Sequence, residues 1–480
     1  MIGVVKVAIF VVFILPPAVL ALLHSAYYYV GARKGDCRRL RVPNPVGGLS
    51  VTVLIPIKNE PEELVAEAVR AIARVKDELG DRYEVVILSD DPSERARVLR
   101  DVAESTAREV GVNLRFVVRT EGNPGRSNAL NYIVPKLASD VIIILDVDAR
   151  PSRGYISKLL KCLEEGYAAC VGRWSGYWRV PTKLAIAVAK SMKFIVDAIY
   201  RGRSRAGLFT FPLGSGTAFR REALIDVGLW DEGVIQDDMH IGAKLMGKGF
   251  KVGYIDDVDL KVLVPSTYSA FRTQQSRWAF GAAETLRRSL KYIARSPYPF
   301  LHKVESALFL AQYVPSAVIC LATLAIPILA LLLNDDILNL PPALIASVIT
   351  AFAIYSVASY LSLRSEGIRF KRALRIMGAS SALTLALSPS ILIHTLLGFI
   401  KFRGRYRVTP KASHELKSRG RPLIELLFIA YISLMIVANL LQGPHVFTVL
   451  WLGTVLSAFI YVVTNAEKVV SVRFGLNRHS

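Results

Sequence analysis

Acidic residues follow two runs of aliphatic residues that have the character of buried β-strands. Asp146 and Asp148 come directly after residues 141–145, and Asp90 and Asp91 follow an earlier run of the same kind. Two carboxylates one residue apart at the end of a strand can share a hard divalent cation, which prefers oxygen ligands. Such a cation would bind a diphosphate and neutralise the charge that develops on it as it leaves. The alternative is a solvated turn, because Asp is common at strand ends.

A second acidic pair opens a predicted helix further along the chain. Asp237 and Asp238 follow Gln236, and the helical pattern continues to Gly247. An Asp at a helix start is either an ordinary N-cap or a general base held at a rigid position, and the pattern alone leaves both alternatives open.

Three residues at helical spacing, Gln274, Arg277 and Trp278, lie in a basic segment that is predicted to be helical from Phe271 to Arg295. A guanidinium can bind phosphate through two parallel N–H groups, and an indole presents a flat face that a sugar ring can cover. A basic helix with aromatic residues also suits a membrane interface, which is the alternative for Arg277 and Trp278.

Strand and helix patterns alternate between residues 51 and 145. The predicted strands are residues 51–57, 84–88, 114–118 and 141–145, and the predicted helices are residues 61–79, 93–110 and 127–137. This alternation predicts an α/β domain with a mostly parallel sheet flanked by helices. Ligands of such sheets bind at the carboxyl ends of the strands, which is where these Asp residues stand.

Composition narrows the class of protein. The chain has 480 residues, of which 52% are apolar, and its net charge is +21. This apolar content excludes a disordered chain, and four Cys residues are too few for a disulfide framework. We interpret Cys37, Cys162, Cys170 and Cys320 as structural thiols, because their spacing fits no metal motif.

Uncharged runs long enough to cross a bilayer flank the α/β region. They are residues 7–32, 306–333 and 337–363, and residues 426–466, a double-length run broken at Gln442-Gly443-Pro444 that predicts a helical hairpin. A further run, residues 376–400, has basic residues on both sides and Ser388-Pro389-Ser390 in its middle. We interpret it as an interfacial or re-entrant helix pair, which leaves five spans.

Basic residues orient the chain in the membrane. Five Lys or Arg residues follow the first run, whereas Lys6 precedes it. Positive residues prefer the cytoplasmic side, so we expect a multi-pass protein of the cell membrane with its N-terminus outside and its α/β domain in the cytosol. A cleaved signal peptide is the alternative for the first run. Arginines cluster at span ends rather than on one soluble face, so no nucleic-acid partner is expected.

The order of these motifs resembles that of the membrane-embedded, inverting family-2 glycosyltransferases, the group that includes cellulose and hyaluronan synthases. The resemblance covers residues 51–411 and includes Lys58-Asn59-Glu60, Asp90-Asp91-Pro92-Ser93, the segment from Gly125 to Asn131, the Asp146/Asp148 pair, Gln236-Asp237-Asp238 and the triplet Gln274, Arg277, Trp278. Each motif alone is a weak signal, whereas all of them in one order are specific. The resemblance implies a GT-A-type domain embedded between transmembrane helices.

The resemblance also implies roles for the motif residues. Asp146 and Asp148 would hold the diphosphate of a nucleotide-sugar donor, with a UDP-sugar expected first, through Mg²⁺ or Mn²⁺, and Asp238 would be the catalytic base. The other implied contacts are Asp90 or Asp91 with the donor's base, Arg126 (at the family's usual Lys) and Arg277 with the diphosphate, and Asp237, Gln274 and Trp278 with the acceptor. Pro92 stands where the family has Gly, which leaves the choice between Asp90 and Asp91 open.

A later segment, Tyr406-Arg-Val408-Thr409-Pro-Lys411, resembles the FxVTxK gating loop of cellulose synthases, with Tyr in place of Phe. It belongs to residues 401–421, which we expect in the cytosol because basic residues flank residues 376–400 on both sides. A basic loop beside the membrane is the alternative for this segment.

The predicted organisation has four parts. They are an N-terminal span with a basic linker (1–42), a cytosolic GT-A domain (43–266), an interfacial amphipathic helix (267–302) and a transmembrane region with a gating-like segment (303–480). The predicted function is transfer of a sugar, with inversion, to a growing polysaccharide that is exported through the protein's own spans. The alternative is a membrane enzyme that adds a sugar to a lipid, as ceramide glucosyltransferases do. A transporter is disfavoured, because the uncharged runs contain no Asp, Glu, Lys or Arg where an ion site would stand.

Overall fold

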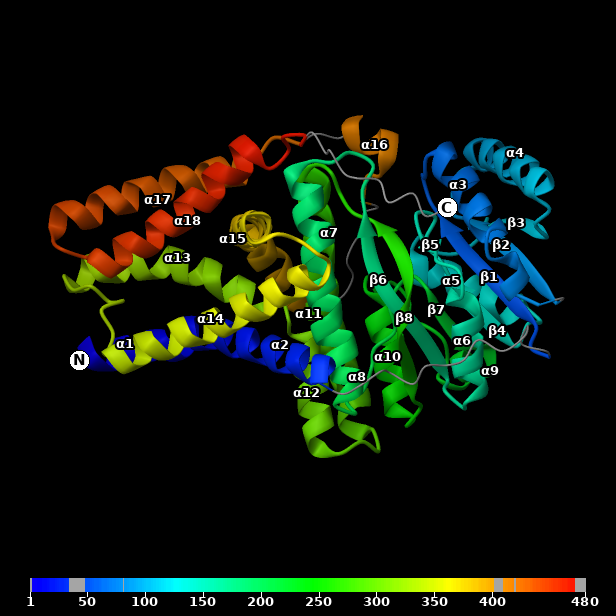
Figure 1. The fold of residues 1–480 in the computed structure, drawn as a ribbon, viewed down its shortest axis with the longest axis horizontal. Coiled ribbons are helices and arrows are strands. Elements are labelled where there is room, and N and C mark those ends of the chain that lie inside the picture. Colours follow the sequence, from blue (N-terminus) through cyan, green and yellow to red (C-terminus); the bar gives the residue numbers. More distant parts are fainter. Residues whose placement is uncertain (1, 34–47, 81, 401–408, 418–419, 471–480) are drawn as a thin grey trace.

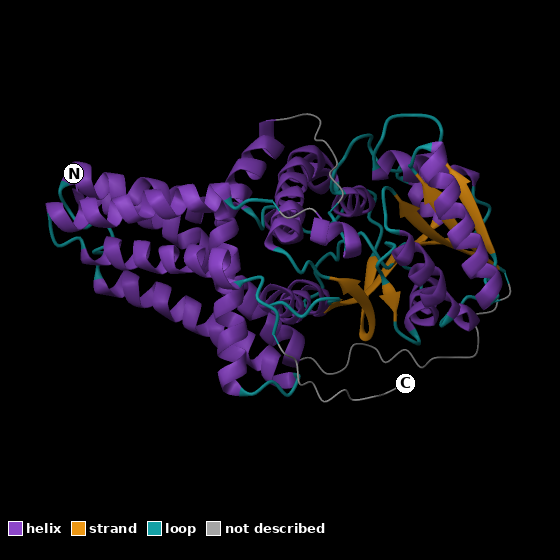
Figure 2. Ribbon diagram, turned by 90° about the horizontal axis from the view of Figure 1, so that it is seen from above, coloured by secondary structure: helices purple, strands orange, loops and turns teal. Residues whose placement is uncertain are grey.

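The computed structural model describes residues 2–33, 48–80, 82–400, 409–417 and 420–470. A β-sheet with its covering helices forms one end of the molecule, and long apolar helices form the other end (Figure 1). Helices α7 (Lys183–Val196) and α11 (Tyr268–Arg295) stand between the two parts. The same division is visible from above (Figure 2).

The sheet has eight strands in the order β3-β2-β1-β4-β7-β6-β8-β5. The strands are β1 (Val51–Ile57), β2 (Tyr83–Ser89), β3 (Leu114–Val118), β4 (Val141–Ile144), β5 (Arg150–Pro151), β6 (Ala169–Tyr177), β7 (Thr217–Arg220) and β8 (Val252–Leu263). Strands β3, β2, β1 and β4 are parallel neighbours, as predicted, and so are β6 and β8. The sheet is mixed because β7 runs antiparallel between β4 and β6, and β5 runs antiparallel to β8.

Helices cover both faces of the sheet. They are α3 (Glu62–Ala73), α4 (Ser93–Val110), α5 (Arg126–Ile133), α6 (Tyr155–Glu164), α9 (Arg221–Asp226) and α10 (Asp237–Gly247), with the 3₁₀ turns η2 (Lys76–Glu78) and η3 (Val134–Lys136). Helix α4 has the predicted bounds, because Pro92 precedes it and Gly111 ends it in the left-handed conformation at φ 64°.

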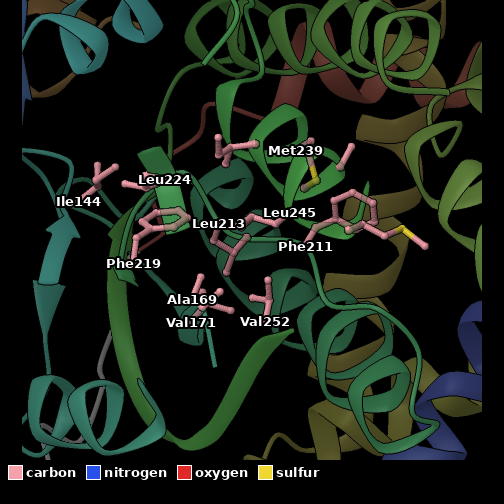
Figure 3. Close-up of a cluster of buried hydrophobic side chains, with 14 of the residues drawn as sticks. Ile144, Ala169, Val171, Phe211, Leu213, Phe219, Leu224, Met239, Leu245 and Val252 are labelled. Atoms are coloured by element: carbon pink, nitrogen blue, oxygen red, sulfur yellow. The ribbon is translucent and has the colours of Figure 1, made fainter. Parts of the chain in front are cut away.

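Successive side chains of a strand point to opposite faces of the sheet, so the strands contribute to two hydrophobic cores. Val53 and Ile55 of β1 pack into one core with residues of α3 and α4, whereas Leu54 packs into the other. Figure 3 shows part of this second core, which joins Phe211 and Leu213 to Leu245 of α10. Because both faces are apolar, β1 and β4 appear in the sequence as unbroken hydrophobic runs.

The prediction of structural thiols is wrong for two of the cysteines. Cys162, in α6, and Cys170, in β6, form a disulfide with a Cα–Cα distance of 6.2 Å. The end of α6 lies against the start of β6, so residues with no recognisable spacing meet in the core. Cys320 is free and buried, and Cys37 lies outside the described residues.

Six helices of the described chain are long and apolar enough to cross a membrane. They are Gly3–Ala32, α13 (Val314–Leu333), α14 (Pro342–Ser365), α15 (Phe370–Ile400), α17 (Leu423–Gln442) and α18 (Val446–Asn465). The first consists of α1 (Ile2–Ile9), the π-helical turn η1 (Phe10–Ile14) and α2 (Leu15–Arg33). The other helical segments are η4 (Asp197–Gly202) and α8 (Arg203–Arg205), which continue α7, and α12 (Phe300–Leu310) and α16 (Ala412–Lys417).

Two of the predicted spans can be compared directly with these helices. The double-length run is a hairpin, as predicted, because α17 ends at Gly443 and α18 begins at Val446. The run at residues 306–333 is divided, because α12 ends at Leu310 and Pro315 stands in the first turn of α13, where a missing N–H is tolerated.

Residues 376–400 lie in one continuous helix, α15, so the predicted helix pair is wrong. Pro389 inside α15 removes one backbone hydrogen bond. Packing compensates, because Ser388, Pro389 and Ser390 are buried and the Ser390 hydroxyl hydrogen-bonds the Ser276 hydroxyl of α11 at 2.7 Å. A helical Pro is tolerated in apolar surroundings where neighbouring helices satisfy the freed groups.

Helix α15 runs across the other long helices at the end of the bundle that faces the sheet (Figure 1). Glu366, just before α15, pairs with Lys190 of α7 at 2.7 Å, and Lys411, beyond its end, pairs with Asp148 after β4 at 2.6 Å. Near the start of α15, Ala373 and Ile376 pack with Ile186 of α7, and near its end Gly398 lies against Phe280 of α11, so both ends contact the helices that stand between the two parts.

Substitution of two glycines at different places on α15 tests how closely this helix packs against α11. A Cβ at Gly398 would overlap the carbonyl oxygen of Phe280 in α11, whereas a Cβ at Gly378 of the same helix would meet nothing within 4 Å. We expect Gly398→Ala to destabilise the protein by about 1–3 kcal/mol through overpacking, and Gly378→Ala to have no such effect. Thermal unfolding of the two purified variants checks this, and equal midpoints would contradict close contact between α15 and α11.

Candidate functional site

One cavity of about 1080 Å³ connects the carboxyl ends of the strands with the long helices. Residues from four regions of the sequence line it: Asp90, Arg126, Asp146 and Asp148 from the first half of the sheet, Asp237 and Asp238 from α10, Gln274, Arg277 and Trp278 from α11, and Thr409 and Lys411 from the segment after α15. The structure thus brings together the predicted site residues that it describes, with the exception of Asp91. Tyr406 and Val408 of the gating-like segment lie outside the described residues.

Arg126, the first residue of α5, joins the acidic groups of the cavity. Its guanidinium donates hydrogen bonds to the Asp237 carboxylate and the Gly214 carbonyl, and lies 3.2 Å from the Asp146 carboxylate. A guanidinium has several N–H donors in one plane, so it can bridge carboxylates from two elements where an ammonium ion would favour one. The Ser215 hydroxyl accepts from the Asp146 backbone N–H at 2.8 Å and fixes the end of β4.

Lys411 reaches the same acidic strand end from the far part of the sequence. Its Nζ donates to Asp148 at 2.6 Å and to Glu60 at 3.4 Å. Burial lowers the pKa of Lys411, but the Asp148 and Glu60 carboxylates outweigh burial and raise it overall. A charged ammonium therefore lies between two carboxylates, at the place where the sequence predicts a metal ion.

The structure distinguishes the two Asp residues that follow β2. Asp91 is buried, accepts from the Asn59 backbone N–H at 2.5 Å and from the Ser89 hydroxyl at 2.8 Å, and holds the turn in which Asn59 has a φ of 53°. Asp90 instead lines the cavity, paired with Lys58 at 2.8 Å and with Arg119. Asp90 is accessible to a ligand, whereas Asp91 stabilises the backbone.

Asp237 and Asp238 differ in their partners. Asp237 accepts a hydrogen bond from the Arg126 guanidinium. Asp238 accepts from the Met239 backbone N–H at 2.8 Å, and its other oxygen lies beside Gly214, where a Cβ would come within 3.2 Å. Burial, and after it the Asp237 carboxylate, raise the pKa of Asp238 to about 7. Asp238 therefore has the pKa of a group that can accept a proton near neutral pH.

Helix α11 holds Gln274, Arg277 and Trp278 against the cavity, and its start is capped by distant residues. The Thr267 hydroxyl accepts from the Ala270 N–H at 3.3 Å. Glu415 accepts from the Ser266 and Thr267 N–H groups at 2.6 and 2.7 Å, and Glu467 accepts from the Tyr268 N–H at 2.7 Å. Carboxylates at a helix start satisfy free N–H groups and favour the helix dipole.

Three charged residues of the site were given no role from the sequence, although Lys58 and Glu60 belong to one of its motifs. Lys58 and Glu60 follow β1, Arg119 follows β3, and each contacts an Asp or Lys of the cavity lining. Their position just after predicted strands could have indicated that they belong to the site, because the carboxyl ends of neighbouring parallel strands meet at one edge of the sheet.

Known proteins resemble the chain over much of its length. Residues 141–397 match the family model described as glycosyl transferase family group 2, and residues 52–228 match glycosyl transferase family 2. A probable glycosyltransferase of Sulfolobus acidocaldarius is 29% identical over 456 residues, which cover 93% of this chain and 95% of that protein. The α/β fold predicted from the sequence is therefore confirmed as a GT-A-like fold with a mixed sheet.

Other similar proteins share part of the chain. The poly-β-1,6-N-acetyl-D-glucosamine synthase of Staphylococcus aureus is 25% identical over 242 residues, covering 50% of this chain and 56% of that protein. Glucomannan 4-β-mannosyltransferase 7 of Arabidopsis thaliana is 27% identical over 259 residues, covering 51% and 45%. A mannosyltransferase structure from Pyrobaculum calidifontis, in complex with GDP-Man and Mn²⁺, aligns over 97% of this chain and 99% of that chain, with a TM-score of 0.43 and 17% identity.

The two Asp residues after β2 give a paired test. We expect Asp90→Asn to weaken the binding of a nucleoside diphosphate, because the carboxylate that the resemblance places against the donor's base is lost. Asp91→Asn should instead lower the thermal midpoint. The Asn59 N–H and the Ser89 hydroxyl donate to different oxygens of the carboxylate, and an amide has only one oxygen. A lost buried partner costs about 1–3 kcal/mol. Calorimetric titration and thermal unfolding of both variants separate the roles, and weaker nucleotide binding by a fully stable Asp91→Asn would reverse the assignment.

Proposed function

Because the chain belongs to glycosyl transferase family group 2, we propose that it transfers a sugar from a nucleotide-sugar donor to an acceptor in the cavity, with inversion at the anomeric carbon. One observation supports this most directly. The cavity is lined by the acidic strand ends and α11 on one side and by the long apolar helices on the other. A nucleotide-sugar donor and an acceptor that enters from the membrane can therefore meet in this cavity.

In this proposal Asp238 is the base. Its carboxylate takes the proton of the acceptor hydroxyl while the acceptor oxygen bonds to the anomeric carbon. The bond from that carbon to the diphosphate breaks, and its electron pair leaves with the nucleoside diphosphate. A single base suffices for one displacement with inversion, and the position of Asp238 at the start of α10 keeps it fixed. Arg277 would bind the departing diphosphate, and Gln274 and Trp278 would contact the acceptor.

The residues at the end of β4 fit a divalent cation. Among the described residues there is no cluster of three or more His, Cys, Asp or Glu side chains suited to a metal, so the chain would supply Asp146 and Asp148. One or two carboxylates plus substrate phosphates is the usual arrangement for Mg²⁺, and Mn²⁺ accepts the same oxygen ligands. When bound, the cation would neutralise charge on the diphosphate. The chain's own contribution is to hold Asp146 at the strand end through Arg126 and Ser215, whereas the carboxylate of Asp148 pairs with Lys411.

The walls of the cavity favour a lipid as the acceptor. Its part between the long helices is lined by apolar side chains that include Phe13, Ile14, Leu20, Ile319, Ile326 and Phe352. A sugar chain there would leave hydroxyls unpaired, at about 1–3 kcal/mol for each buried group. An aliphatic chain instead gains about 0.8 kcal/mol for each buried CH₂. We therefore propose that the acceptor is attached to a lipid tail that lies in this part of the cavity.

A processive polysaccharide synthase of the cellulose and hyaluronan synthase type is the second candidate. The contact of Lys411 with Asp148 favours it, because a gating-like segment that reaches the donor site suits repeated cycles. Relatives over half of the chain are named as a polysaccharide synthase and a glucomannan mannosyltransferase. In either case we propose a cytosolic catalytic part, an outside N-terminus and an interfacial α15, which agrees with the contacts of its two ends with α7 and α11.

The assignment of Asp238 as the base predicts that two neighbouring substitutions affect activity differently. Asp238→Asn keeps size and capping ability but cannot accept a proton, so we expect transfer to fall by about 10²–10⁴-fold while donor binding persists. Asp237→Asn changes the same charge one residue away and serves as the control. Initial rates and donor affinity are the measurements, and an inactive Asp237→Asn beside an active Asp238→Asn would move the base by one position.

The raised pKa of Asp238 also predicts a pH profile. A base acts in its deprotonated form, so activity should fall as the pH decreases through about 7 rather than through the range of an ordinary Asp. The residual rate of Asp238→Asn should lack this limb. An acidic limb near pH 4 in the wild type would contradict the assignment.

Lys411 and the metal are expected to compete for Asp148. A hydrogen bond between charged groups contributes about 1.5–3 kcal/mol, so Lys411→Met should lower the Mn²⁺ concentration for half-maximal nucleotide binding by about tenfold. Lys58→Met is the matched control, because Lys58 pairs with Asp90 at 2.8 Å in the same cavity. A higher Mn²⁺ requirement for Lys411→Met would show that the ammonium assists donor binding.

The proposal of a lipid acceptor predicts that the product is soluble in organic solvent and that a bulky side chain in the cavity blocks transfer. A labelled donor should give a product that extracts into organic solvent with one or a few sugars, whereas a long polymer would favour the second candidate. Ala322→Phe, in the lining of α13, should reduce transfer but spare hydrolysis of the donor. Leu321→Phe is the control, because Leu321 is exposed beside Ala322 and does not line the cavity.

A further inference from the structure

Glu284 of α11 is a buried carboxylate that the proposed mechanism does not use. Its side chain is 0% exposed, and it does not line the cavity. It follows Arg277 by seven residues, which is close to two helical turns, so both side chains lie on nearly the same face of α11. A buried carboxylate needs partners, because its burial without them is costly. Those partners indicate what Glu284 does.

Both carboxylate oxygens of Glu284 have partners that lead to the start of α10. Its Oε2 accepts a hydrogen bond from the Ile235 backbone N–H at 3.0 Å, and α10 begins two residues later at Asp237. Its Oε1 accepts from Arg288 at 3.3 Å, and the same guanidinium lies 3.4 Å from the Glu232 carbonyl oxygen. Glu284 therefore connects α11 to residues 232–235, both directly and through Arg288.

A second contact with this segment lies one turn earlier on α11, at Gly281. A Cβ at this position would come within 2.8 Å of the Gln236 Cβ and 3.2 Å of the Gln236 backbone nitrogen. The backbone of α11 therefore lies directly against the residue that precedes α10. Ile235 and Gln236 line the cavity, whereas Gly281 and Glu284 do not. Helix α11 thus supports this part of the cavity wall from behind.

These contacts bear on the reaction because the two helices carry different parts of it. In the proposed function α10 carries the base, Asp238, and α11 carries Arg277, which binds the departing diphosphate. A displacement with inversion requires the attacking oxygen and the leaving group to be aligned on the anomeric carbon, so the base and the diphosphate-binding group need a fixed separation. A misplacement of about 1 Å can lower a rate by about 10²-fold.

We propose that Glu284 is a positioning residue, which holds the start of α10 against α11 and so sets the separation of Asp238 from Arg277. This inference rests on the proposed function and goes beyond it by naming a residue outside the cavity that determines the rate of transfer. The alternative is that Glu284 only stabilises the fold.

The test compares Glu284→Met with Glu284→Gln in the full-length protein. Methionine keeps the length of the side chain but cannot accept from the Ile235 N–H as an oxygen does, whereas glutamine keeps one acceptor oxygen. Glu78→Met is the matched control for stability. Glu78 accepts from two backbone N–H groups at the start of α6, at 2.6 and 3.0 Å, and does not line the cavity.

The rate and the affinity for nucleotide should respond differently. The donors are UDP-glucose, UDP-N-acetylglucosamine and GDP-mannose with Mn²⁺, and the acceptors are hexadecanol and dodecyl glucoside. Glu284→Met should lower kcat by about 10–100-fold without changing the affinity for UDP or GDP, and Glu284→Gln should recover most of the lost rate. Gly281→Ala, which pushes α11 away from Gln236, should also lower kcat. Glu78→Met should lower the thermal midpoint and keep the wild-type kcat.

Two further measurements separate positioning from stability. In the Asp238→Asn background, Glu284→Met should have little further effect, because the misplaced group is no longer a base. A loss of folded protein would instead lower the rate by the same factor in both backgrounds. Hydrogen–deuterium exchange at the Ile235 amide, measured without donor, should be faster in Glu284→Met than in Glu284→Gln and the wild type.

Three results would overturn the inference: a wild-type kcat in Glu284→Met, a loss that glutamine does not recover, or an equal loss in the Asp238→Asn background. Failure of the proposed function has a different signature, because the wild type itself would turn over none of the three donors. The exchange measurement still reports on the contact in that case, and unchanged exchange at Ile235 in Glu284→Met would show that Glu284 does not hold the start of α10.

Discussion

The guanidinium of Arg126 is the interaction on which the arrangement of this site depends. Three segments far apart in sequence, the end of β4, the loop before β7 and the start of α10, meet at this one cation. Without it, the carboxylates of Asp146, Asp237 and Asp238 would repel one another in a partly desolvated cavity, where charges interact more strongly than in water. The position usually has Lys in the family that the sequence resembles, and the planar donor set of Arg explains how one side chain can serve two carboxylates and a carbonyl.

A second consequence of this geometry concerns the two carboxylates of α10. Since Arg126 is bonded to Asp237, the positive charge that faces Asp238 is reduced, and burial together with the Asp237 charge moves the pKa of Asp238 upward. Two adjacent residues of the same type therefore acquire different properties from their partners alone. The same holds for Asp90 and Asp91, of which one faces the cavity and the other fixes a turn. Sequence order does not distinguish the members of such pairs, because the distinction lies in contacts with distant residues.

The sequence pattern alone predicts the bounds of a segment that is uniformly apolar or lies between Pro and Gly. It is insufficient where contacts with distant residues stabilise the segment. Strands β1 and β3 and helix α4 have the predicted bounds, because buried aliphatic runs and a Pro–Gly boundary determine them. Strands β6 and β8 were not predicted, since β6 contains two Gly residues and β8 contains three Asp residues, and both are stabilised by pairing with each other. Helix α15 was misjudged at Pro389 because the compensating contact comes from Ser276. The site motifs were predicted as a set, whereas the roles of Glu60 and Arg119 depend on burial and contacts that spacing does not encode.

The capping of α11 bears on how the protein matures during synthesis. Its first N–H groups are bound by Glu415 and Glu467, and Lys411 pairs with Asp148, so residues beyond 409 stabilise a helix and an acidic strand end that precede residue 300. A ribosome that has translated the whole sheet has therefore not yet produced the groups that fix α11. Until the residues beyond 409 have been translated, the groups that cap α11 and pair with Asp148 are absent. The order of translation thus places the completion of the acidic strand end after the synthesis of the whole sheet.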